Sequence, residues 1–141
     1  MGRILSIDLG DIRTGFAVSD PSGFLASGIG TVECESRRKL VDVIINYVNE
    51  YAVSEIVLGN PVNMNGTKGE RSEKVEVFAE RLRESLEVPV VLFDERCTTM
   101  AAHRILNATD TRGKKRKNVI DTLSAQIILQ NYLDMKRNTV K

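Results

Sequence analysis

The amino-acid sequence has no tryptophan, a single histidine, three prolines and only two cysteines. Cys34 and Cys97 are too few and too isolated for a disulfide framework or a zinc knuckle. The longest apolar runs are far shorter than the roughly 20 residues of a membrane span, and no signal-peptide pattern opens the chain. We therefore expect a cytoplasmic protein without a membrane partner. His103 has no acid or thiol at a suggestive spacing, so a catalytic role for it is not expected.

The composition is that of an ordinary folded domain. Hydrophobic residues make up 42% and charged residues 28% of the 141 residues, which excludes wholesale disorder. A chain of this length is large enough to bury roughly two thirds of its unfolded surface. We expect one domain that spans residues 1–141.

The net charge of +1 conceals an uneven distribution along the chain. Residues 1–95 contain ten Lys and Arg against sixteen Asp and Glu, a balance of −6, whereas residues 96–141 contain ten against three, a balance of +7. Five cations, here called the basic block, lie within six positions: Arg112, Lys114, Lys115, Arg116 and Lys117. Such a block favours a polyanionic partner at one face, and a solvated loop without function is the alternative.

The spacing of apolar residues predicts a mixed α/β fold. Short apolar runs predict strands over residues 3–9, 14–20, 27–33, 55–59 and 88–94. Amphipathic spacing predicts helices over residues 36–51, 70–86 and 118–135 and a short one from Thr98 or Thr99 to 106, with loops over 60–69 and 107–117. The order βββαβαβ followed by helices predicts a mixed five-stranded sheet with helices on both faces.

Three acids occur in settings where an acid is unusual. Asp8 lies within an apolar strand, Glu95 follows another, and Asp121 lies within the last helix pattern. A buried carboxylate is costly unless it is compensated, often by a metal ion. Asp8 has no routine structural role. Asp121, in contrast, could interact favourably with the helix dipole if it lies in a first helical turn, and Glu95 could form a surface ion pair with Arg96.

Ligand sites in open α/β sheets form beyond the carboxyl ends of parallel strands, where Asp8 and Glu95 are expected. Oxygen ligands without His or Cys suit Mg²⁺ or Mn²⁺ and not zinc. Two such ions roughly 4 Å apart support phosphodiester cleavage. The basic block could then hold the phosphates of a nucleic acid. Together these features favour a metal-dependent nuclease.

Four sequence blocks carry a resemblance to a known family. They are IDLG at 7–10 with GFAVSD at 15–20, VLGNPVNMNGT at 57–67, DERCTT at 94–99, and KNVID at 117–121 with ILQNYLD at 128–134. In order and spacing they resemble the YqgF/RuvX family of bacterial RNase H-like nucleases over nearly the whole chain. The resemblance implies an RNase H-like fold and implies that Asp8, Glu95 and Asp121 are the metal-binding catalytic acids, with Asp8 bridging two ions.

The resemblance also implies a biological role: processing of the 5′ end of pre-16S rRNA, in contact with ribosomal precursor particles, or resolution of Holliday junctions. We favour the rRNA role. The family usually has Lys or Arg at position 12, an apolar residue at position 60 and Leu at position 97; here these are Ile12, Asn60 and Cys97. Because Ile12 cannot bind a phosphate, Arg13 is the expected substitute.

The predicted phosphate contacts are Arg13, Arg96 and the basic block, and Thr98 or Thr99 either caps a helix or contacts substrate. A nucleic-acid-binding module without catalysis is one alternative. An ATP-binding protein of the actin and Hsp70 type is another, since residues 8–15 resemble its phosphate loop, but that type uses two such domains. The sequence ranks neither RNA against DNA nor monomer against homodimer.

Overall fold

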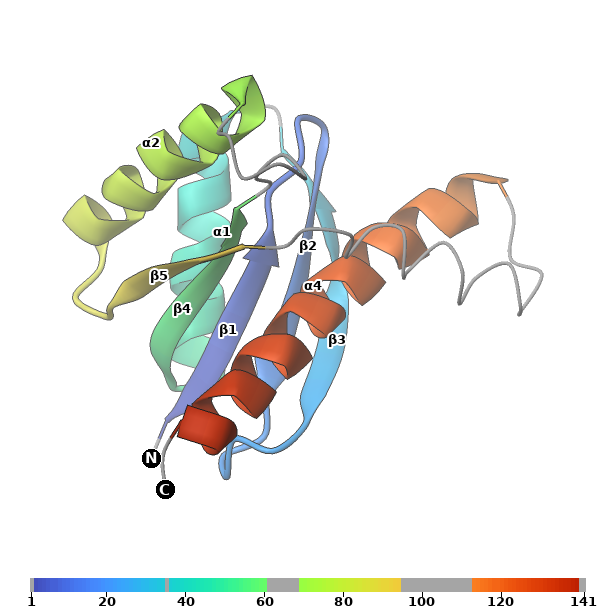
Figure 1. Ribbon diagram of the computed structural model, residues 1–141. Coiled ribbons are helices and arrows are strands. Elements are labelled where there is room, and N and C mark those ends of the chain that lie inside the picture. Colours follow the sequence, from blue (N-terminus) through green and yellow to red (C-terminus); the bar gives the residue numbers. More distant parts are fainter. Residues whose placement is uncertain (1, 35, 61–68, 95–112, 140–141) are drawn as a thin grey trace.

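A computed structural model describes residues 2–34, 36–60, 69–94 and 113–139. Its centre is one five-stranded sheet of spatial order β3-β2-β1-β4-β5 (Figure 1). The strands are β1 (Arg3–Asp8), β2 (Arg13–Ser19), β3 (Ala26–Glu33), β4 (Val53–Asn60) and β5 (Val90–Asp94). The first three form an antiparallel meander, and β4 and β5 run parallel to β1.

Helices cover both faces of the sheet (Figure 1). Helices α1 (Arg37–Glu50) and α2 (Glu70–Ser85) pack on one face, and α4 (Gly113–Thr139) crosses the other. The alternation of β1 explains this division, because Leu5 and Ile7 join the core under α1 and α2, whereas Ile4 joins the core under α4. The sheet is therefore buried on both sides, as expected for parallel strands joined by helices.

Polar contacts fix the direction of α4 across the sheet. Thr122 Oγ1 lies 2.7 Å from Thr31 Oγ1 near the end of β3, and Gln130 Oε1 accepts a 3.0 Å hydrogen bond from the Ala26 N–H at its start. Helix α4 therefore runs antiparallel to β3 and to β1. The buried Ser6 hydroxyl donates a 2.6 Å hydrogen bond to the Ala125 carbonyl, which holds the middle of the helix on β1.

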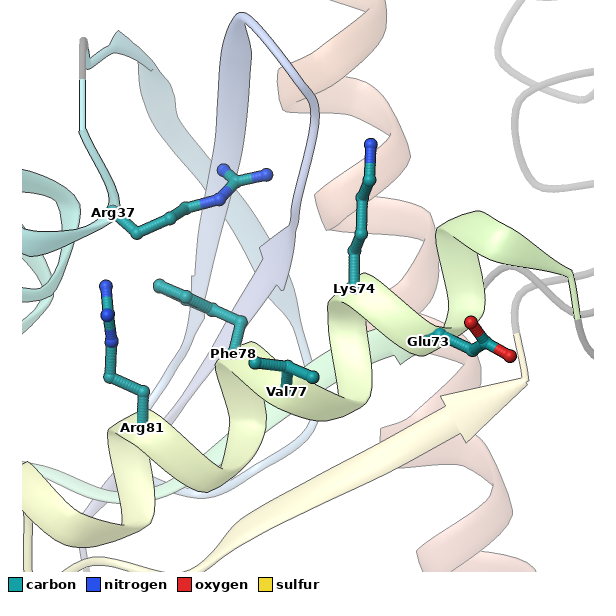
Figure 2. A pocket seen from close by; sticks show the side chains of 6 residues that line it. All are labelled: Arg37, Glu73, Lys74, Val77, Phe78 and Arg81. Carbon is teal, nitrogen blue, oxygen red and sulfur yellow. The ribbon is translucent and has the colours of Figure 1, made fainter.

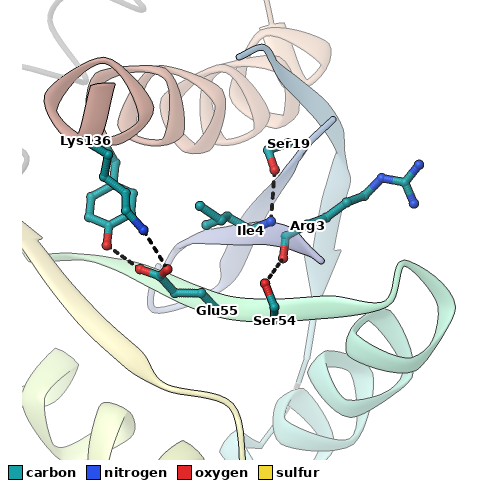
Figure 3. A network of polar contacts seen from close by, with 7 residues as sticks. Arg3, Ile4, Ser19, Ser54, Glu55 and Lys136 are labelled. Carbon is teal, nitrogen blue, oxygen red and sulfur yellow. Dashed lines mark hydrogen bonds and ion pairs between the residues drawn. The ribbon is translucent and has the colours of Figure 1, made fainter. Parts of the chain in front are cut away.

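The other end of α4 is held to β4 by the half-buried carboxylate of Glu55. This carboxylate accepts hydrogen bonds from the Tyr132 hydroxyl and from Lys136 Nζ, the latter at 3.0 Å (Figure 3). Burial and the bond to Glu55 raise the pKa of Tyr132 above its usual range. The tyrosine therefore stays protonated and remains a donor to Glu55.

The turn between β2 and β3 is organised by Asp20, as the sequence predicts. Its carboxylate accepts hydrogen bonds from the Ser22 hydroxyl and from the backbone N–H groups of Phe24 and Leu25, the last two at 2.8 and 3.1 Å. These bonds, that from Ser22 foremost, lower the pKa of Asp20 to about 2. Asp20 thus has a structural role.

The predicted strands and the helices at α1 and α2 are confirmed, with ends displaced by a few residues. Two loop predictions are wrong in part. Asn60 belongs to β4, and Lys114–Lys117 belong to α4, which begins at Gly113 and not at Asn118. The short helix predicted from Thr98 or Thr99 lies outside the described residues. Within the described part of the chain, no helix combines the length and apolar character needed to cross a membrane.

Candidate active site

Asp8 ends β1 at the edge of the sheet where the three parallel strands have their carboxyl ends. Asn60 and Asp94 end the neighbouring strands β4 and β5 and are paired in register. Side chains alternate along a strand, so Asp8 points to the same face of β1 as Ile4 and Ser6, which face α4. Asp8 is thus at the predicted carboxyl edge, its half-buried carboxylate belongs to the α4 face of this edge, and Glu95 follows Asp94 directly in the sequence.

Glycines occupy both positions beside Asp8. Gly15 is its cross-strand partner on β2, and Gly59 on β4 directly follows Leu58, the partner of Ile7. Both glycines are buried. No side chain from either adjacent strand therefore flanks the carboxylate on the α4 face. A carboxylate oxygen donor between two glycines on the adjacent strands fits a hydrated Mg²⁺ or Mn²⁺ ion, which keeps several waters.

Residue 121 of α4 lies across from this position. Ala125 is held against Ser6. Asp8 is two residues further along β1, about 6.7 Å, and residue 121 is one turn earlier in α4, about 6 Å. Because the two elements run antiparallel, both steps lead to the same edge. The side chain of Asp121 lies outside the described residues.

The position of Asp121 excludes the interpretation that it only stabilises the dipole of a first helical turn. Residue 121 comes eight residues after Gly113, where α4 begins, which is more than two helical turns. The prediction of a first-turn position is therefore wrong. Since the helix dipole acts within the first turn, it does not account for an acid at this position.

The remaining predicted site residues are only partly described. Glu95, Arg96, Thr98 and Arg112 lie outside the described residues, and Lys114, Lys115, Arg116 and Lys117 lie in the first turns of α4 without described side chains. Among the side chains that are described, no three His, Cys, Asp or Glu residues gather as a metal site. The three-acid metal site therefore stays a prediction.

Comparison with known proteins assigns the family. Residues 2–135 match the family model described as "RuvX: Holliday junction resolvase". The chain belongs to the RuvX family.

Relatives of this RuvX family member carry another name. This chain is 49% identical over 140 residues to the "Putative pre-16S rRNA nuclease" of Geobacillus kaustophilus, covering 96% of this chain and 99% of that protein. The protein of the same name from Ruminiclostridium cellulolyticum is 44% identical over 133 residues, covering 94% of each. Among solved structures, the "T. thermophilus RuvC in complex with Holliday junction substrate" superimposes with a TM-score of 0.60 at 12% identity, covering 97% of each chain. This likeness confirms the expected RNase H-like fold.

Arg13 lies at the same edge of the sheet in this RuvX protein. Arg13 starts β2. It is two residues from Gly15, the partner of Asp8, and therefore points to the same face of the sheet as Asp8. Its guanidinium is 21% exposed and forms an ion pair of 3.5 Å with Glu33, its cross-strand partner. A phosphate contact from Arg13 therefore stays a prediction, and such a contact would compete with Glu33.

The residues that shape the loop after Asp8 could not be predicted from local sequence. A Cβ at Gly10 would lie 2.1 Å from the Arg13 carbonyl oxygen, so only glycine fits there without a shift of the backbone. Arg37 Nη1 donates a 3.1 Å hydrogen bond to the Gly10 carbonyl, and its guanidinium lies over the ring of Phe78. One sequence feature indicates a special role for Arg37. Helix α1 begins with three cations at residues 37–39 and has no acid in its first turn, although the helix dipole favours acids there.

Asn60 at the end of β4 has a buried partner. The Ser72 hydroxyl donates a 2.6 Å hydrogen bond to Asn60 Oδ1, and the two residues are 0% and 7% exposed. This bond joins the end of β4 to the first turn of α2. It thereby connects the edge of the sheet that carries Asp8 to the α2 layer.

Replacing Ser72 with Ala is expected to lower the free energy of unfolding by about 1–3 kcal/mol, because Asn60 Oδ1 would be buried without a donor. The double variant Asn60→Leu/Ser72→Ala is expected to recover to within about 1 kcal/mol of the wild type, since both polar partners are then apolar. Urea unfolding of the two variants measures the difference. A double variant no more stable than Ser72→Ala would contradict this account.

Proposed function

We propose that this RuvX family member is a metal-dependent nuclease that cleaves phosphodiester bonds in structured nucleic acid, with the 5′ end of pre-16S rRNA as its favoured substrate. One observation carries the proposal: Asp8 lies at the carboxyl edge of the sheet, between two glycines and across from position 121 of α4. The name of the curated relatives favours the rRNA substrate.

The proposed metal ligands are Asp8, Glu95 and Asp121. Phe93, two residues before Glu95 in the sequence, faces α4: its ring packs edge-on against Tyr132 at 5.7 Å between ring centres. Divalent ions held at the edge that carries Asp8 would supply an activated water and stabilisation of the leaving oxygen. The three carboxylates would hold these ions, with Asp8 as the proposed shared ligand.

The proposed phosphate contacts include residues in the first turns of α4. Lys114 and Lys117 precede Asp121 by seven and four residues, the spacing of one helical stripe. Figure 1 shows that the first turns of α4, which carry them, extend beyond the sheet. A basic stripe leading to an acidic site lets phosphates bind beside the ions without neutralising the carboxylates. The other proposed contacts are Arg13, Arg96, Thr98, Arg112, Lys115 and Arg116.

A Holliday junction is the second candidate substrate, favoured by the description of the family model and by the fold shared with a junction-bound RuvC. A cleavage assay separates the two candidates. A structured RNA containing the 5′ end of 16S rRNA and its leader, and a four-way DNA junction, are each incubated with Mg²⁺, with Mn²⁺ or with EDTA.

We expect metal-dependent cleavage of the RNA at a higher kcat/KM than of the junction, and no cleavage in EDTA. Faster cleavage of the junction would favour the second candidate. Binding of either substrate without cleavage in any metal would contradict the nuclease proposal and favour a binding module.

A further inference from the structure

A cavity of about 520 Å³ lies between α1 and α2, on the opposite face of the sheet from α4. Six residues line it: Arg37, Glu73, Lys74, Val77, Phe78 and Arg81 (Figure 2). Three of these are cations and one is an acid. This positive lining stands out because residues 1–95 carry a net charge of −6.

The side chains of the cavity are arranged to receive an anion. Figure 2 shows Arg81 and Phe78 extending toward Arg37, whereas the Glu73 carboxylate points away from them. Among the described residues, the Arg81 guanidinium makes no hydrogen bond or ion pair. The Lys74 side chain is 53% exposed, and its Nζ lies 3.9 Å from Asp11 Oδ1, a distance that leaves the ammonium largely solvated. Val77, 71% exposed, adds an apolar surface between the cations.

The cavity is connected to Asp8 through the loop that follows it. Arg37 binds the carbonyl of Gly10, and Lys74 lies near Asp11, two and three residues after Asp8. Both α1 and α2 begin at the sheet edge that carries Asp8, since they follow β3 and β4. A strand bound at Asp8 can therefore continue over this loop into the cavity.

We infer that the cavity binds the phosphate backbone of a single nucleic-acid strand that extends from the site at Asp8, an inference that rests on the proposed nuclease function. Cations interleaved with exposed apolar surface are typical of single-strand binding grooves. Arg81 and Lys74 contact phosphates, and Arg37 holds the loop and contributes its charge. Val77 contacts a sugar or base.

The test uses the full chain with Asp8→Asn, so that bound RNA is not cut. Binding to an RNA hairpin with a single-stranded extension, and to the hairpin alone, is measured by fluorescence anisotropy over a range of salt concentrations. Lys74→Gln/Arg81→Gln removes two exposed cations from the cavity. Arg38→Gln is the matched control, since Arg38 is exposed on α1 and does not line the cavity.

For the extended RNA, the double variant is expected to reduce the slope of log K against log salt by about 1.4, because each single-strand phosphate contact contributes about 0.7. Binding of the hairpin alone and the slope of Arg38→Gln are expected to be unchanged. An unchanged slope for the double variant would overturn the inference and assign the cavity to another partner, such as a protein.

The outcomes separate this inference from the nuclease proposal. RNA cleavage by the protein with native Asp8, together with an unchanged slope for the double variant, would overturn the inference alone. A reduced slope for the extended RNA without cleavage by the native protein would support the cavity as a binding site and contradict the nuclease proposal. A chain that binds neither RNA would overturn both.

Discussion

Replacing Asp8 with Asn is expected to reduce the rate of RNA cleavage by about a thousandfold, the equivalent of about 4 kcal/mol of transition-state stabilisation that the metal ligand supplies. Asn is close to Asp in size and leaves the backbone pairing of β1 with β2 and β4 in place. It removes the negative charge and replaces one of the two carboxylate oxygens with an amide donor. Binding of RNA is expected to remain within about twofold, since phosphate contacts supply most of the affinity. Single-turnover cleavage in Mg²⁺ and anisotropy measure the two effects.

Asp42→Asn is the matched control for this variant. It removes the same charge from an exposed position on α1, on the opposite face of the sheet. We expect its cleavage rate to equal that of the wild type. Equal turnover by Asp8→Asn and the wild type would refute the assignment of Asp8, whereas a similar loss in both variants would show a general effect of charge.

Gly10→Ala is expected to reduce kcat by about a hundredfold, the cost of displacing reacting groups by about 1 Å. The added Cβ would lie 2.1 Å from the Arg13 carbonyl oxygen, and that oxygen belongs to the backbone. The loop must therefore shift, and it is joined directly to Asp8 at one end and to β2 at the other. Steady-state kinetics on the same RNA measure the loss, and the far-ultraviolet circular dichroism is expected to be unchanged.

Gly23→Ala separates this local effect from a general loss of stability. Gly23 has a φ of +76°, and a Cβ added to it would meet no atom within 4 Å; it lies in the turn after Asp20 at the other end of the sheet. Its substitution costs roughly 1 kcal/mol of backbone strain. We expect a lower Tm and a normal kcat. A normal kcat for Gly10→Ala as well would show that the loop does not position Asp8.

The sheet and the place of Asp8 could be predicted from the sequence because their signals are local. The alternation along β1 and the glycine-bearing turns define the meander, and the helices between β3, β4 and β5 require parallel pairing. An acid within an apolar strand is conspicuous against this pattern. The edge of the sheet where Asp8 and Asp94 end their strands follows from topology alone.

Other features depend on contacts that leave no periodic signal. The first turns of α4 carry Lys114–Lys117, which lack apolar periodicity and were predicted as a loop, although Lys and Arg are good helix formers. The bond from Ser72 to Asn60 and the bond from Arg37 to Gly10 each join residues from separate elements. Such pairs are determined by how the layers pack, and the local sequence does not encode them.

The hydrogen bonds that place α4 join residues far apart in the chain. Ser6 and Ala125 are separated by 119 residues, and Ala26 and Gln130 by 104. Contacts of such high sequence separation form slowly, because the entropy of closing a long loop must be given up before the contact forms. We therefore expect α4 to dock on the sheet late in folding. On refolding, cleavage is expected to recover only as α4 docks, so enzymatic activity would measure the completion of the fold.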